Sequence, residues 1–214
     1  MIEEGQWFVE EAGTYLGLDV PDEGTLTIYL YRWRWDLWRH LGKVCPKLRW
    51  RRAACCEDAS GYMIGLSGNP DSPILVRNLR HELIHYLLAS HFSDFPPWID
   101  EGLAQVMARG PAFPSLGSGD KEEIADMLGD ISVCGLRDLI SVAPGETLSN
   151  TQYHLAWAWT YVLLTTVPDG KEKIIGYLNE TRTNMDQEKL FAQIWGSSLE
   201  EMVGAIKTTL PRHR

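Results

Sequence analysis

The segment Leu79–Phe92, LRHELIHYLLASHF, places two histidines and a glutamate inside an otherwise apolar stretch. Its apolar residues cover most of the circumference of a helix, which predicts a buried α-helix over Asn78–Ser90. Burying an unpaired polar group costs roughly 1–3 kcal/mol, and a charged group costs more. We therefore expect His81, Glu82 and His85 to have partners that compensate this cost.

These three residues form the pattern HExxH. Residues four apart lie one above the other on a helix, so His81 and His85 can both point at one metal ion. Glu82 lies about 100° around the helix from His81, within reach of a water molecule held by that metal. In the alternative interpretation, both imidazoles hydrogen-bond to the backbone and Glu82 reaches solvent.

A catalytic zinc ion needs a third protein ligand. The downstream segment Pro96–Ala104, PPWIDEGLA, predicts a helix over Pro97–Arg109, because proline suits the first turn. Glu101 and Gln105 share a polar face of this helix, opposite its apolar residues. Asp100 competes for the ligand role but lies about 100° from that face. Glu101 could instead be a solvated acid favoured by the helix N-terminus.

HELIH followed by PPWIDEGLA resembles the gluzincin metallopeptidases, the superfamily of thermolysin and the aminopeptidase-N-type enzymes, and is most similar to the small peptidase MA-like proteins. The resemblance implies that His81, His85 and Glu101 bind Zn²⁺ and that Glu82 is the general base. It covers roughly residues 60–210, loosely in the stretches GLRDLISV, YHLAWAWTYVLL and WGSSLEEM.

The chain departs from this pattern at one supporting position. Thermolysin-type enzymes have an aspartate four residues after the third ligand, whereas this chain has Gln105. A glutamine can still accept an imidazole N–H, so the group that orients a ligand histidine would be neutral. Related enzymes also stabilise the oxyanion with a tyrosine or histidine from a later helix. Tyr153 is the candidate for that role, with His154 next, and a purely structural tyrosine is the alternative.

The function expected from this resemblance is zinc-dependent hydrolysis of a peptide or protein substrate, with Glu82 activating the water. An alternative is a catalytically inactive zincin-fold protein that serves as a binding module or scaffold. A second alternative is a helical interaction protein that contains HExxH by chance.

The order of elements predicts an α+β fold, with strands early and helices late. We expect a single zincin-like domain over residues 1–214, with a strand-rich part at 1–92 and a helical part at 93–214. The expected strands are Thr25–Tyr31, Gly61–Leu66 and Ile74–Val76. The other expected helices are Ile2–Leu16, Arg32–Lys43, Asp120–Leu128, Gly135–Val142, Gln152–Thr166, Gly170–Glu180, Gln187–Trp195 and Ser198–Leu210. Gly110–Gly119 is expected to be a surface connection, and Trp35 and Trp38 are expected to be core residues.

Composition limits the other functions. The net charge of −9 argues against a nucleic-acid-binding protein, which needs a cationic surface. No stretch is apolar over the roughly 18–20 residues of a membrane span. The first 20 residues lack a signal peptide, which predicts a cytoplasmic protein, although a chain cut free of an export signal would look the same. The four cysteines (Cys45, Cys55, Cys56 and Cys134) show no CxxC or CxxH spacing, so neither a zinc finger nor a redox motif is indicated. The adjacent Cys55 and Cys56 are each expected to be a buried, reduced thiol.

Overall fold

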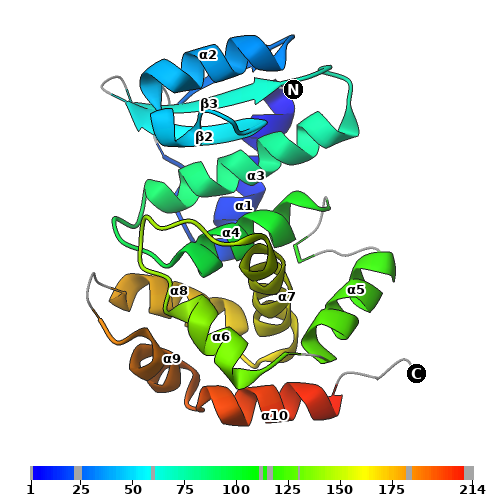
Figure 1. Cartoon of the computed structure of the whole chain (residues 1–214), viewed down its shortest axis with the longest axis vertical. Helices are drawn as coiled ribbons and strands as arrows, with labels where there is room; N and C mark the ends of the chain where they lie inside the picture. The colour runs from blue at the N-terminus through cyan, green and yellow to red at the C-terminus, as the bar shows by residue number, and fades with distance from the viewer. Residues whose placement is uncertain are drawn as a thin grey trace. The chain divides into compact units, whose positions relative to one another are not determined.

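The computed structural model describes residues 2–21, 26–58, 61–110, 113–114, 118–129, 131–181 and 185–209. Within these ranges the chain is α+β, with one small sheet and many helices, as the sequence predicted (Figure 1). The strands are β1 (Leu26–Tyr31), β2 (Ala53–Asp58) and β3 (Gly61–Ser67). The helices are α1 (Ile2–Leu16), α2 (Arg34–Val44), the short 3₁₀ helix η1 (Pro46–Leu48), α3 (Pro73–Ala89), α4 (Pro97–Ala108), α5 (Ser118–Gly129), α6 (Val133–Ile140), α7 (Asn150–Thr166), α8 (Gly170–Glu180), α9 (Gln187–Trp195) and α10 (Leu199–Thr209).

The described residues divide into two compact units. The first contains Met1–His91 and Met107–Arg109, and the second contains Phe92–Val106 and Gly110–Arg214. A single zincin-like domain over 1–214 stays a prediction. The connection expected at Gly110–Gly119 falls partly outside the described residues, at 111–112 and 115–117, and α5 already begins at Ser118.

The sheet of the first unit has the order β1-β3-β2. β1 runs parallel to β3, and β2 runs antiparallel to it. Two of the strands were expected from the sequence, and β2 was not. Its sequence, AACCED, lacks the β-branched and aromatic residues that indicate a strand, so its pairing with β3 determines its conformation.

The sheet of the first unit lies between two helices (Figure 1). α2 covers one face and packs closely at Gly65, where an added Cβ would lie 2.7 Å from the Leu37 side chain. Between α2 and this face of the sheet lies a small core of Leu37, Leu41, Ala54 and Met63. α3 contacts the sheet from the other side in Figure 1, and its Leu79 and Leu83 lie against α1 at Gly5.

A disulfide joins Cys45 and Cys56 beside this core, so the expectation of a reduced thiol is wrong for Cys56. The bond links the residue after α2 to β2. Spacing gave no sign of it, because the pairing depends on how β2 lies under α2. Cys55 and Cys134 are not part of a disulfide.

α3 is longer than the sequence indicated. It begins at Pro73 and runs for 17 residues, so the strand expected at Ile74–Val76 is wrong. Proline occupies its first turn, where no backbone N–H is needed, and Leu75 is buried while Ile74 is 60% exposed. The three apolar residues are therefore the start of the helix that carries HExxH.

The two tryptophans of α2, Trp35 and Trp38, were expected to be core residues, and this expectation is wrong. Trp35 is 71% exposed, and it contacts Trp38 edge-to-face at 5.6 Å. Trp38 in turn contacts Trp50, which is 63% exposed. Three-residue spacing indicated a helix here, but it did not reveal which side of that helix the sheet covers.

The core of the second unit is aromatic. Tyr177 of α8 lies 5.9 Å from Trp98 of α4 and 5.2 Å from Trp195 of α9, centroid to centroid. Burial raises the pKa of Tyr177, whose hydroxyl donates to the Gln187 side chain at 2.8 Å.

The ends of two helices in this unit carry local signals. The capping box of Ser149 and Gln152 begins α7, and Gly196 ends α9 with a positive φ of 68°. Among the described residues, no helix combines the length and the apolar character that a membrane span requires.

Candidate metal centre

Two of the candidate ligands stand one turn apart on α3. The His81 and His85 side chains are half-buried, and their rings meet edge-to-face with centroids 4.7 Å apart. Their Nε2 atoms are 3.0 Å apart. Both Nε2 atoms therefore converge on one point, as the four-residue spacing predicted for a helix.

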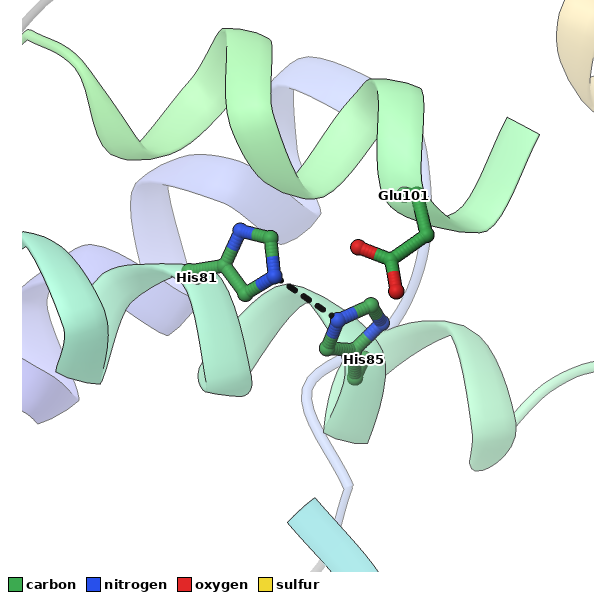
Figure 2. A group of neighbouring side chains, drawn as sticks. All are labelled: His81, His85 and Glu101. Atoms are coloured by element: carbon green, nitrogen blue, oxygen red, sulfur yellow. Dashed lines mark hydrogen bonds between the residues drawn. The ribbon is translucent and has the colours of Figure 1, made fainter. Parts of the chain in front are cut away.

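α4 supplies the third member of the group. One ligand atom from each of His81, His85 and Glu101 lies within 4.8 Å of the other two, and Figure 2 shows the Glu101 carboxylate directed toward the imidazoles. Asp100, the competing acid, does not belong to this group. The difference follows from the rotation of about 100° between neighbouring helix positions.

The donor set fits a zinc ion. Zinc binds imidazole nitrogen at about 2.0–2.1 Å and carboxylate oxygen at about 2.0–2.2 Å, and two nitrogens on a tetrahedral zinc lie about 3.3 Å apart. The observed separation of 3.0 Å between the Nε2 atoms needs a shift of only a few tenths of an ångström. A hydrogen bond between the two rings accounts for the same distance, so metal analysis is the measurement that separates the two interpretations.

Glu82 is buried. Its exposed fraction is 7%, which removes the interpretation of HExxH in which this glutamate is a solvated surface acid.

Contacts between α4 and α7 hold the helix of Glu101. Gly102 faces α7 so closely that an added Cβ would lie 2.1 Å from Thr160 Oγ1 and 2.7 Å from the Ala156 carbonyl oxygen. One turn after Glu101, the Gln105 side-chain amide donates to the Tyr153 backbone carbonyl at 2.9 Å. The sequence predictions did not include Gly102, although a glycine inside an apolar helix often indicates a close approach.

The proposed oxyanion residues lie near the N-terminal end of α7. Tyr153 is half-buried and His154 is exposed, and their rings meet edge-to-face. The Gln105 amide nitrogen donates to the Tyr153 carbonyl, and the Gln105 Oε1 is the one atom of this side chain that can accept an imidazole N–H. That role of Gln105, and the role of the Tyr153 hydroxyl, stay predictions.

Two further side chains contact backbone carbonyl oxygens at the C-terminal end of α3. His91, the third histidine of the segment, is exposed and its Nδ1 lies 2.9 Å from the Leu87 carbonyl oxygen. Tyr62 of β3 donates to the Ala89 carbonyl at 3.0 Å, and burial raises the pKa of its hydroxyl. Tyr62 thus fastens the end of the HExxH helix to the sheet, a role that the sequence did not indicate.

Comparison of the chain with protein-family models, with curated proteins and with solved structures found no match.

Proposed function

We propose that this protein is a zinc-dependent peptidase in which His81, His85 and Glu101 hold the metal. The observation that carries the proposal is the grouping of the three ligand atoms within 4.8 Å, although the residues come from two separate helices. The sequence pattern specifies only how the candidate ligands are spaced within each helix. A chance HExxH does not require a third ligand from another element to lie at the same point.

The chemistry follows from the donor set. Two neutral imidazoles and one carboxylate leave a bound zinc ion with a net charge of +1, so that it can acidify a water molecule and polarise a peptide carbonyl. The Glu82 carboxylate accepts a proton from the attacking water and then donates it to the leaving amine. The low exposure of Glu82 keeps bulk water from competing for that proton.

The zincin-like arrangement is part of the same proposal. α3 lies against a sheet that includes a parallel strand pair, and it presents both histidines on one side. Tyr153 would stabilise the oxyanion, with His154 as the alternative. The expected substrate is a peptide or an unfolded segment of a protein.

The compartment is a separate question. The cytoplasmic location expected from the first 20 residues stays a prediction. The Cys45–Cys56 disulfide argues for an oxidising compartment, because disulfides rarely persist in reducing cytosol.

The test uses metal analysis and peptide cleavage on the same protein samples. The wild type should bind about one zinc per chain, and His81→Ala should abolish this binding. His91→Ala is the control, since its side chain is exposed beyond the end of α3 and should leave the zinc in place. In the same way, Glu101→Gln should weaken zinc binding while Asp100→Asn should not.

The catalytic step is tested with Glu82→Gln. This variant should keep the zinc and lose cleavage of a broad peptide library by at least about 10²-fold. A wild type that binds zinc and cleaves no peptide would favour the inactive binding or scaffold module. A wild type that binds no metal would favour the accidental HExxH.

A further inference from the structure

A second site lies at one end of the sheet in the first unit. It is a pocket of about 280 Å³, formed where the parallel strands β1 and β3 end and α3 begins. Its lining includes several side chains that can donate hydrogen bonds, among them Arg32, Arg34, Arg52, Asn69, Ser72 and Asn78.

The three arginines of this pocket have no acidic partner among the described residues. Arg32 and Arg34 lie over the rings of Trp33 and Trp38, at 5.3 and 5.6 Å from the ring centroids. Residues 32–52 carry eight lysines and arginines and a single acid, in a chain of net charge −9. Three guanidinium groups that line one pocket repel one another, so an anion bound between them would be stabilised.

The backbone around the pocket is held in place. The Gly68 N–H donates to the Tyr31 carbonyl at 3.0 Å, and the Ser72 N–H donates to the Asn69 carbonyl at 3.0 Å. Gly68 has a φ of 149°, which favours glycine at this position. Ser72 is the N-cap residue of α3, and its hydroxyl makes no capping bond. The positive end of the α3 dipole adds to the arginine charges.

The pocket and the two histidines lie on one face of α3. Positions 74, 78, 81 and 85 follow the spacing of a single stripe along a helix. Ile74 and Asn78 line the pocket, and His81 and His85 belong to the metal group. At about 1.5 Å per residue, Asn78 is about 4.5 Å and Ile74 about 10.5 Å along the helix axis from His81.

We propose that this arginine pocket binds a carboxylate of an extended peptide, and that the peptidase therefore prefers substrates with aspartate or glutamate near the cleaved bond. This inference rests on the proposed function for its meaning as a specificity subsite. An extended chain advances about 3.3 Å per residue, so the acidic residue should stand two to four residues from the scissile bond. Arginine suits this ligand because its planar fork matches a carboxylate.

Binding can be tested without catalysis. The probe is a capped, fluorescently labelled hexapeptide with glutamate at its third and fourth positions, compared with the same peptide containing glutamine. In the Glu82→Gln background, which should not cleave the probe, the glutamate peptide should bind at least tenfold more tightly than the glutamine peptide, and raising NaCl from 50 to 500 mM should weaken its binding. Arg34→Gln with Arg52→Gln should remove this preference. Arg39→Gln with Lys43→Gln removes the same charge from the exposed side of α2, outside the pocket, and should retain the preference.

The same binding measured on His81→Ala separates the two proposals. If the preference for glutamate persists in this variant while the wild type cleaves nothing, the pocket is a carboxylate site and the peptidase proposal fails. If the wild type cleaves peptides but glutamate at any of the first five positions on either side of the bond has no effect on kcat/KM, the pocket proposal fails and the peptidase stands.

Two further outcomes would also overturn the pocket proposal. One is an equal loss of binding in the pocket variant and in the charge-matched control, because the attraction would then come from the general charge of residues 32–52. The other is a competition result in which free glutamate does not displace the labelled peptide while inorganic phosphate binds tightly. The pocket would then be a phosphate site.

Discussion

The side-chain amide of Gln105 donates a hydrogen bond to the backbone carbonyl of Tyr153 at 2.9 Å, and this bond joins α4 to the first turn of α7. Gln105 is 8% exposed and lies one turn after Glu101. The bond therefore sets the rotation of the helix that presents Glu101. It acts in the same place as the tight packing of Gly102 on Thr160.

Replacing Gln105 by leucine should weaken both the fold and the metal site. The loss of one buried hydrogen bond predicts a decrease of about 1 kcal/mol in the free energy of unfolding, measured by urea denaturation. The loss of a supporting contact predicts a zinc affinity lower by roughly tenfold, measured by competition with a chromogenic chelator. Gln193→Leu, at an exposed position of α9, is the control. It should leave both the free energy of unfolding and the zinc affinity close to the wild-type values. Unchanged zinc affinity in Gln105→Leu would show that this bond does not position Glu101.

Gly102→Ala should be strongly destabilising. An added Cβ at 2.1 Å from Thr160 Oγ1 must push α4 away from α7, which predicts a loss of about 1–3 kcal/mol and weaker zinc binding. Gly176→Ala in α8 is the matched control, because no atom would lie within 4 Å of its Cβ. This control should be neutral or stabilise the protein by up to about 1 kcal/mol, since alanine favours a helix more than glycine. Equal melting temperatures for the two variants would contradict the close packing of α4 on α7.

Breaking the Cys45–Cys56 disulfide should lower the stability of the first unit. The bond closes a short loop with a sequence separation of 11, and the chain-entropy argument gives about 3 kcal/mol for such a loop. Cys45→Ala with Cys56→Ala should reproduce the effect of a phosphine reductant on the thermal midpoint. Cys134→Ser, at an exposed free thiol, should not change the midpoint. A wild type whose midpoint is the same with and without reductant would mean that the two cysteines are not bonded in solution.

The N-cap of α9 predicts a specific pH dependence. Asp186 accepts a hydrogen bond from the Lys189 N–H at 3.1 Å, and this bond lowers the pKa of its carboxyl below the ordinary value of 3.8. A carboxyl with a lower pKa in the folded state contributes stability above its unfolded pKa and loses it as the pH falls. Asp186→Ala should therefore melt at a lower temperature than the wild type at pH 7, and this difference should shrink below about pH 4. Calorimetry between pH 7 and pH 3 measures it, and a difference that is constant over this range would refute the assignment.

The helical part of the fold could largely be predicted from the sequence. Helices α8 and α9 have the bounds expected from apolar spacing, and the flanking signals are local: Asp186 before α9 and Gly196 after it. The sheet was less predictable. β2 is a strand because it pairs with β3, and Ile74–Val76 is helical because it continues into the HExxH helix after Pro73. Short apolar runs carry no period of their own, so only long-range pairing separates the two conformations.

For the candidate site, the order of residues along the chain is enough to show which side chains share a helix face, because the period of 3.6 residues places His85 above His81 and separates Glu101 from Asp100. Three other features appear only in the folded chain: Glu101 lies beside the histidines, Glu82 is buried, and Arg32, Arg34 and Arg52 line one pocket. These arrangements join residues from separate elements. They depend on packing between elements, at positions such as Gly65 and Gly102, and no local period in a single chain encodes them.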